Sequence, residues 1–98
     1  MSYKIDWSEK ALSKLEDLGN ANAKIMRQVF MRCTALRRNP KPQDCEDLQN
    51  FTYKGFKGRR VDQGEYRIVF AVDEEHKKVF IGLILNRNED YKELKNIR

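Results

Sequence analysis

A cluster of basic residues stands in the second half of the chain, in a stretch predicted to form a β-hairpin. Four of them fall within seven positions that contain no acidic residue: Lys54, Lys57, Arg59 and Arg60. A turn at Gln63-Gly64 would place Arg60 opposite Arg67, and Asp62 opposite Glu65. Like charges facing each other destabilise a sheet unless an anion binds between them. The pattern therefore fits an anion-binding site, but it fits equally well a hairpin whose long side chains spread into solvent.

A third arginine follows the last apolar segment of the chain, residues 79–85. Arg87 and Tyr91 stand four residues apart, so a helical turn starting at Arg87 would project the guanidinium and the phenol on the same side. Consecutive antiparallel strands would bring Arg87 near the hairpin face that carries Arg60 and Arg67. Ordinary explanations remain open, since Arg87 can pair with a neighbouring carboxylate and Tyr91 can cover the edge of the core.

The first half of the chain contains the elements expected to support this cluster. Residues 3–7 alternate apolar and polar and predict a strand, after which Ser8 can cap a helix. Its apolar stripe is Ala11, Leu12, Leu15 and Leu18, and Gly19-Asn20 is predicted to end it. Asn20 or Asn22 caps a second helix, which Pro40 ends. Its expected buried face is Ile25, Met26, Val29, Phe30, Cys33 and Leu36. The short link predicts an antiparallel helix hairpin.

The second half has the pattern of a β-sheet. Residues 39–50 contain both prolines and predict a loop anchored by Leu48. Three strands joined by short turns are predicted at 56–62, 65–72 and 79–85, the last of them apolar on both sides and therefore central. A short helix is expected at 89–97. The fold class is α+β: an N-terminal strand, a two-helix hairpin, and a three-stranded antiparallel meander in a twisted sheet with the helices on one face.

Composition limits the possible functions. The 98 residues predict one domain, 1–98, with a formal net charge of +5. The longest apolar run is too short to cross a bilayer and the N-terminus has no secretory pattern, so we expect a cytoplasmic protein. Cys33 and Cys45 are expected to be free thiols. A single histidine, His76, and the lack of nucleotide-binding or serine-hydrolase motifs argue against zinc, other metals and cofactors.

Several segments resemble the RelE/ParE toxin superfamily of bacterial toxin–antitoxin modules. The segment 64–72, the strand at 79–81, and Asn86-Arg87 followed by Tyr91 carry the resemblance, and 5–15 and 36–40 also fit. It spans nearly the whole chain and implies a cognate antitoxin as partner. In the RelE-like branch it implies a ribosome-dependent endoribonuclease that cuts mRNA in the ribosomal A site. The ParE-like branch instead implies a DNA gyrase inhibitor, and a third hypothesis is a basic domain that only binds RNA or protein.

The resemblance to the RelE-like branch also implies a set of site residues. Carried over by position, the catalytic residues are Arg60, Arg67, Arg87 and Tyr91. Lys57 is a further candidate to orient the phosphate or donate a proton, and Lys54 and Arg59 are candidate RNA contacts. The chain departs from the branch at Gly58, where a lysine is frequent, and at Asn86, where a histidine is frequent and could act as a general base.

The implied chemistry needs no metal. The 2′-hydroxyl attacks the adjacent phosphate, and fixed guanidinium groups such as Arg67 and Arg87 stabilise the charge that collects on the phosphate oxygens. Tyr91 can act as the base if nearby cations lower its pKa, or can stack on a nucleobase. Little activity is expected on naked RNA. The hypothesis requires the guanidinium groups to meet at one place, and internal carboxylate bridges to them would argue against it.

Overall fold

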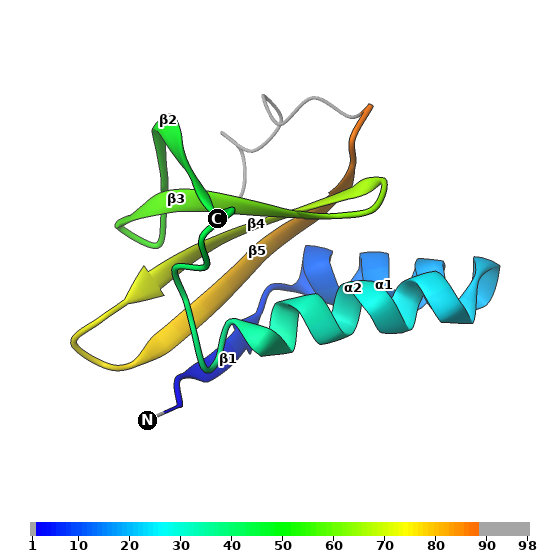
Figure 1. Cartoon of the computed structure of the whole chain (residues 1–98), viewed down its shortest axis with the longest axis horizontal. Coiled ribbons are helices and arrows are strands. Elements are labelled where there is room, and N and C mark those ends of the chain that lie inside the picture. Colours follow the sequence, from blue (N-terminus) through cyan, green and yellow to red (C-terminus); the bar gives the residue numbers. More distant parts are fainter. Residues whose placement is uncertain (1, 89–98) are drawn as a thin grey trace.

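The computed structural model describes residues 2–88, which form two helices and a five-stranded sheet. The elements are β1 (Lys4–Trp7), α1 (Glu9–Ala21), α2 (Ala23–Ala35), β2 (Glu46–Tyr53), β3 (Phe56–Gln63), β4 (Tyr66–Asp73) and β5 (Lys78–Asn86). Both helices lie on one face of the sheet, whose strand order is β1-β5-β4-β3-β2 (Figure 1). The α+β class is therefore confirmed. The helix expected at 89–97, and Tyr91 within it, lie outside the described residues.

The helix hairpin forms with hardly any loop. The Ser8 hydroxyl caps α1 by accepting a hydrogen bond from the amide of Ala11 at 3.0 Å. The amide of Asn22 donates to the carbonyl of Leu18, while its side chain caps α2. A single residue thus closes one helix and opens the next. The predicted stop at Gly19-Asn20 is wrong, because α1 packs against α2 there and the helix continues to Ala21.

The N-terminal strand lies beside the last strand of the chain. β1 pairs in parallel with the first half of β5, from Lys4 opposite Lys78 to Trp7 opposite Ile81. The Ser8 amide donates to the carbonyl of Ile81, and its hydroxyl donates to that of Gly82 at 2.6 Å. The expected central position of the 79–85 segment is confirmed, because β5 lies between β1 and β4 and is buried along most of its length.

The segment 39–50 is only partly the loop that was expected. Both prolines precede β2, but the strand begins at Glu46, so the antiparallel meander has four strands rather than three. Its inward residues are Leu48, Phe51 and Tyr53, which do not alternate regularly. The pairing of β2 with β3 shifts between Asp47 and Thr52, and Asn50 has a φ of 56°. This irregularity hides the period-two pattern that identifies a strand.

The turn between β3 and β4 lies one residue later than predicted, which shifts the pairing register by two residues. Asp62 lies opposite Arg67 and Gln63 opposite Tyr66, so the turn residues are Gly64 and Glu65. Gly64 has a φ of 58°, which suits the first central position of a two-residue hairpin turn. The predicted like-charged pairs are therefore wrong, and an opposite-charged pair takes their place. A shift of two residues leaves every side chain on its predicted face.

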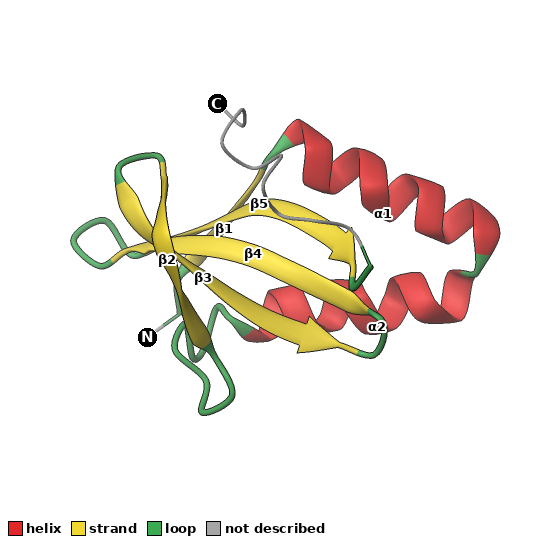
Figure 2. Ribbon diagram, turned by 90° about the horizontal axis from the view of Figure 1, so that it is seen from above, coloured by secondary structure: helices red, strands yellow, loops and turns green. Residues whose placement is uncertain are grey.

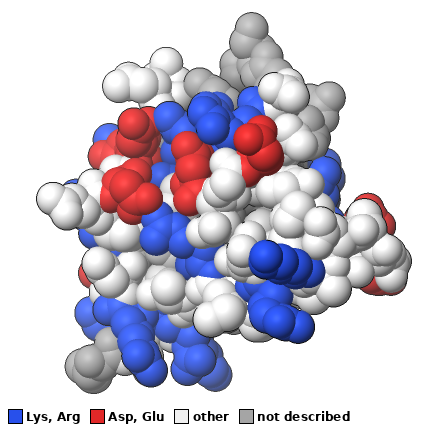
Figure 3. All heavy atoms as spheres, turned by 45° about the vertical axis from the view of Figure 1, so that its right-hand side comes forward, with Lys and Arg blue, Asp and Glu red and all other residues white. Residues whose placement is uncertain are grey.

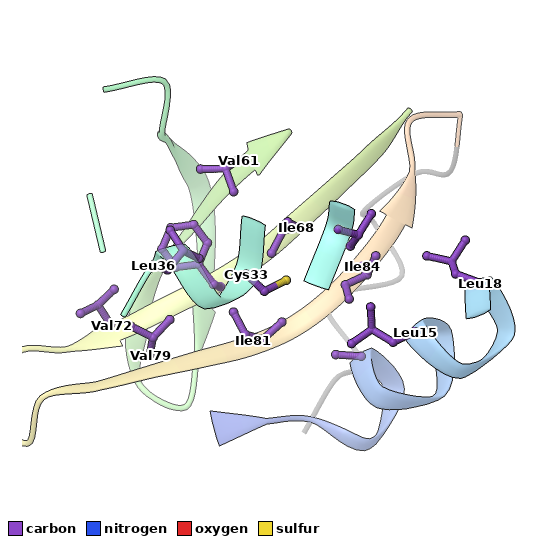
Figure 4. Close-up of a cluster of buried hydrophobic side chains, with 13 residues drawn as sticks. Leu15, Leu18, Cys33, Leu36, Val61, Ile68, Val72, Val79, Ile81 and Ile84 are labelled. Atoms are coloured by element: carbon purple, nitrogen blue, oxygen red, sulfur yellow. The ribbon is translucent and has the colours of Figure 1, made fainter. Parts of the chain in front are cut away.

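The main core fills the space between the helices and the sheet (Figure 4). Ile68, Ile81 and Ile84 contribute from the sheet, while Leu15 and Cys33 contribute from α1 and α2. Burial raises the pKa of the Cys33 thiol to about 12, and neither Cys33 nor Cys45 forms a disulfide. On the opposite face of the sheet, β2 crosses the other strands and covers a smaller apolar cluster (Figure 2), which consists of Leu48, Val69, Leu83 and Leu85.

Among residues 2–88, neither helix has the length and apolar character needed to span a bilayer. The same residues contain no group of three side chains suited to holding a metal ion.

Candidate functional site

The three arginines that the sequence analysis singled out lie at one end of the sheet, and we call them the arginine cluster: Arg60, Arg67 and Arg87. Arg60 on β3 and Arg67 on β4 occupy the face opposite the helices, and their side chains are 21% and 25% exposed. Arg67 pairs in register with Leu85 of β5, and Arg87 follows two residues later. The amide of Arg87 donates to the carbonyl of Glu65 at 2.7 Å, which fixes it beside the β3–β4 turn.

Two carboxylates lie within this cluster. Asp62 Oδ1 is 3.3 Å from Arg60 Nη1 and 3.6 Å from Arg67 Nε. Glu46 of β2 forms a second ion pair with Arg60. The face shown in Figure 3 has acidic side chains directly beside basic ones. Arg60 and Arg67 are thus bridged by internal carboxylates, in contrast to the open cationic pocket that the nuclease hypothesis requires.

Sequence reasoning missed both carboxylates as partners of the arginines. The predicted turn placed Asp62 opposite Glu65, and the predicted loop left Glu46 with no strand partner. The register of β3 with β2 and β4 sets Glu46 opposite Arg60 and Asp62 opposite Arg67. The signal available in the sequence was Gly64, whose freedom to adopt a positive φ favours a turn at Gly64-Glu65.

One donor of the arginine cluster is unsatisfied. Arg67 Nε is buried and has no hydrogen-bond partner among the described residues. The carboxylate of Asp62, 3.6 Å away, is close enough for an ion pair but too far for a hydrogen bond. Leaving a buried donor unpaired costs about 1–3 kcal/mol. An anion that reached this nitrogen would recover that loss.

The other basic candidates lie elsewhere. Lys57 and Arg59 are on the helix-facing side of β3, where Lys57 pairs with Asp47 at 3.5 Å. Arg59 Nη1 donates to the carbonyl of Pro40 at 3.3 Å. The register shift lies in β2 alone. Because β3 keeps its regular alternation, the side chains of Lys57 and Arg60 lie on opposite faces of the sheet. The placement of Lys57 in the catalytic set is therefore not supported by the geometry, and neither Lys57 nor Arg59 joins the arginine cluster.

Lys54 is also distant from the arginine cluster. It occupies the β2–β3 turn with a φ of 54°, at the end of the sheet opposite Arg87. Its ammonium lies 5.8 Å from the ring centre of Tyr53 and 5.7 Å from that of Phe80. This geometry is a cation–π contact, which stabilises the turn without bringing Lys54 to the arginines.

The structure explains why position 58 is a glycine. The ring of Phe51 packs directly over it, and a Cβ built at Gly58 would lie 2.3 Å from Phe51 Cδ2. No side chain fits at this position while Phe51 covers the sheet. The departure from the lysine that is frequent in the RelE-like branch therefore follows from the path of β2 across β3.

The single histidine of the sequence lies in a turn at the other end of the sheet. His76 is in the β4–β5 turn, where its Nδ1 is 2.9 Å from Asp73 Oδ2. Its backbone amide donates to Asp73 Oδ1 at 3.0 Å. This amide bond is the main reason why the pKa of Asp73 is lowered. His76 is therefore a turn residue remote from the arginines.

Comparison with known protein families shows which family the chain belongs to. The model of the ParE toxin of the type II toxin–antitoxin system parDE matches residues 5–91. The chain belongs to this family of toxins. The resemblance to the RelE/ParE superfamily is thereby confirmed, and the toxin is one component of a toxin–antitoxin module. No protein of curated function matches the sequence.

Solved structures give the same fold. The toxin is similar to a chain of the RelBE2 complex of Mycobacterium tuberculosis, with 22% identity and a TM-score of 0.70 over 89% of the toxin and 100% of that chain. A chain of the archaeal RelE–RelB complex of Pyrococcus horikoshii has 20% identity and a TM-score of 0.72, with coverage of 92% and 100%. The isolated RelE toxin of Escherichia coli has 18% identity and a TM-score of 0.70, with coverage of 96% and 94%.

Proposed function

We propose that the toxin is a ribosome-dependent, metal-independent endoribonuclease that cleaves mRNA in the ribosomal A site and so inhibits translation. The observation that carries this proposal is the position of the three arginines. Adjacent strands bring Arg60 and Arg67 to one face of the sheet, and the amide of Arg87 is held beside the β3–β4 turn at the same end. The unsatisfied Arg67 Nε adds a donor that an incoming anion can use. Guanidinium groups suit the planar oxygens of a phosphodiester.

The proposed reaction is an internal transfer at phosphorus. The 2′-oxygen forms a bond to the adjacent phosphorus as its proton passes to a base, and the bond from phosphorus to the 5′-oxygen breaks as that oxygen takes a proton. The products are a 2′,3′-cyclic phosphate and a free 5′-hydroxyl. Arg67 and Arg87 would stabilise the charge on the phosphate oxygens, and Arg60 would orient the group. Tyr91 keeps its two proposed roles, as the base or as a stacking partner for a nucleobase.

The carboxylates suggest why such an enzyme would need the ribosome. Asp62 and Glu46 balance the charge of Arg60 and Arg67, so the toxin alone has little attraction for a flexible RNA strand. Both acids are exposed, at 41% and 63%, and exposed ion pairs are worth about 0–1 kcal/mol. A phosphate held in place by the ribosome can therefore displace them, because positioning reduces the entropic cost of binding.

The test is translation in vitro with ribosomes and a defined mRNA, followed by primer extension. We expect the toxin to cut the message at codon-level positions, and Arg67→Ala and Arg87→Ala each to lower the cleavage rate by about 10²–10³-fold. The matched control is Arg27→Ala, which removes an exposed arginine from α2 and should cut like the unmodified toxin. An intact message with the unmodified toxin would rule the proposal out.

The second candidate is inhibition of DNA gyrase without nuclease activity. The family model that matches the chain describes a ParE toxin, and the ion pairs of Arg60 reduce the positive charge of the arginine cluster. Gyrase–DNA breaks that accumulate while the mRNA stays intact would favour this function over the first.

We also propose a cognate antitoxin as the protein partner and the cytoplasm as the site of action. Several of the similar structures are toxin–antitoxin complexes, and the net charge of +5 fits an acidic partner. The antitoxin would either cover the arginine cluster or displace the C-terminal segment. A neighbouring reading frame that encodes a small acidic DNA-binding protein, and that protein's co-purification with the toxin, would support this partner.

A further inference from the structure

We propose that Asp62 occupies the phosphate position in the free toxin and that a bound phosphate takes its place. The inference rests on the proposed function, because it assigns the same arginines to phosphate. It concerns a residue that lies between those arginines and has no role of its own in the proposed reaction.

The contacts of Asp62 are those that a phosphate oxygen would make. A single oxygen, Oδ1, lies between guanidinium groups of adjacent strands, 3.3 Å from Arg60 Nη1 and 3.6 Å from Arg67 Nε. The second oxygen, Oδ2, is 3.4 Å from Arg60 Nη1. A carboxylate and a phosphate present the same kind of charged acceptor to an arginine. Because Asp62 and Arg67 face each other in the sheet register, this carboxylate is held where the two guanidinium groups converge.

The same contacts are loose enough to be exchanged. The Asp62 side chain is 41% exposed and stands two residues before the β3–β4 turn, so it can rotate into solvent without disturbing the core. It leaves Arg67 Nε without a hydrogen bond. Arg60 keeps Glu46 as a partner when Asp62 leaves. A phosphate oxygen at hydrogen-bond distance from Arg67 Nε would satisfy the donor that Asp62 does not.

Displacement of Asp62 makes the site selective. An anion that binds must compete with a carboxylate already held by two guanidinium groups, so a dilute, freely diffusing phosphate competes poorly. A phosphate whose position is fixed by a larger assembly competes well, because its binding costs less entropy. Asp62 thereby acts as a specificity-determining residue that disfavours binding of loose anions.

The test uses inorganic phosphate as the probe and the full-length toxin. Binding is followed by the ¹⁵N–¹H signal of Arg67 Nε at constant ionic strength. Asp62→Asn keeps the shape of the side chain and removes its charge, and should bind phosphate about three- to tenfold more tightly than the unmodified toxin. The matched control is Asp47→Asn, which removes the same charge from the pair with Lys57 on the other face and should leave the affinity unchanged.

Two outcomes would overturn the inference: equal or weaker phosphate binding by Asp62→Asn, or an equal gain from Asp47→Asn, which would indicate a general charge effect. Asp62→Ala repeats the measurement if the asparagine variant fails to fold by circular dichroism. Adding Arg67→Ala to Asp62→Asn should abolish the gain; because this variant lacks the Arg67 Nε signal, its phosphate binding is measured by isothermal titration calorimetry.

The binding assay contains no ribosome, so it is independent of the cleavage assay. Tighter phosphate binding by Asp62→Asn, with no mRNA cleavage by the unmodified toxin, would support the inference and refute the nuclease. Cleavage without tighter binding by Asp62→Asn would support the nuclease and refute the inference.

Discussion

At the scale of single residues, the charged side chains of the hairpin take their partners from neighbouring strands. Arg60 pairs with Glu46 fourteen positions away, and Arg67 pairs with Asp62 across the β3–β4 turn. Arg67 Nε remains the exception, since it is buried without a hydrogen-bond partner among residues 2–88. Whether Arg60 or Arg67 can bind an anion therefore depends on whether its carboxylate partner can be displaced. The register of the strands determines which carboxylate that partner is.

Asp73 provides a prediction about pH. The hydrogen bond from the His76 amide lowers the pKa of Asp73, so the ionised form of Asp73 favours the folded state. A lowered folded-state pKa gives stability that is present above the unfolded pKa of about 4 and is lost as the pH falls through the folded value. Asp73→Asn should therefore be less stable than the unmodified toxin at pH 7, and the difference should shrink by pH 3. Urea unfolding at both pH values measures it, and a constant difference would contradict the assignment.

The two cysteines provide a second residue-scale prediction. Cys33 is fully buried and the pKa of its thiol is raised to about 12, whereas Cys45 is partly exposed and burial raises its pKa less. Because the thiolate is the reactive form, a thiol reagent should label Cys45 slowly in the native toxin and Cys33 only after unfolding. Counting labelled thiols with and without denaturant checks this. The control is Cys45→Ser, whose native form should take no label; rapid native labelling of Cys33 would show that the core is open.

At the scale of elements, β2 decides the shape of the face that carries the arginine cluster. Its Leu48 and Phe51 cover the apolar side chains of β4 and β5, and its Glu46 pairs with Arg60. The strand reaches across the sheet because Phe51 packs on a residue without a side chain, Gly58. Packing between β2 and β3 therefore sets the position of Glu46 and of the arginines together.

This dependence can be tested at Gly58. Alanine there would bring Cβ to 2.3 Å from Phe51 Cδ2, so the ring must move and part of the cluster beneath β2 would be uncovered. We expect Gly58→Ala to lower the free energy of unfolding by about 1–3 kcal/mol, measured by denaturant unfolding.

The matched control is Gly19→Ala in α1, where the new Cβ would meet Met26 at an ordinary 3.6 Å. Alanine in a helix is favoured over glycine by about 0.5–1 kcal/mol, so this variant should be more stable. A stable Gly58→Ala would mean that Phe51 has another place to pack.

At the scale of the whole molecule, the net charge of +5 and the paired charges of Arg60 and Arg67 have different consequences. The excess of basic residues gives the toxin a general attraction to polyanions, which salt weakens. Arg60 and Arg67 are paired with Asp62 and Glu46 and add little to that attraction. Binding to RNA and cutting RNA should therefore be separable.

The corresponding prediction compares substrates. Naked RNA should bind the toxin weakly, with an affinity that falls as salt is raised, and should not be cut at a measurable rate. The same RNA on a ribosome should be cut. Gel electrophoresis of a labelled RNA with and without ribosomes measures both, and equal cleavage of naked RNA would contradict the proposed dependence on the ribosome.

The sequence by itself determined both helices, four of the five strands and their order. The caps at Ser8 and Asn22, the helical stripes and the apolar strand at 79–85 depend on local backbone preferences and on residue spacing, which a linear chain displays directly. The face of each hairpin residue was also predictable, because side chains alternate along a strand. For that reason Lys57 and Arg59 lie on the face of β3 opposite Arg60.

Only the tertiary structure decided which groups meet. The strand at Glu46–Tyr53 has no regular alternation because it is irregularly paired and packs across the sheet on Gly58. In the structure the β3–β4 turn lies one residue later than expected, so Arg67 lies opposite Asp62 and not opposite Arg60. Pairing energies between distant segments depend on contacts that form only when the chain folds, so a one-dimensional pattern determines the face of a residue but not its partner.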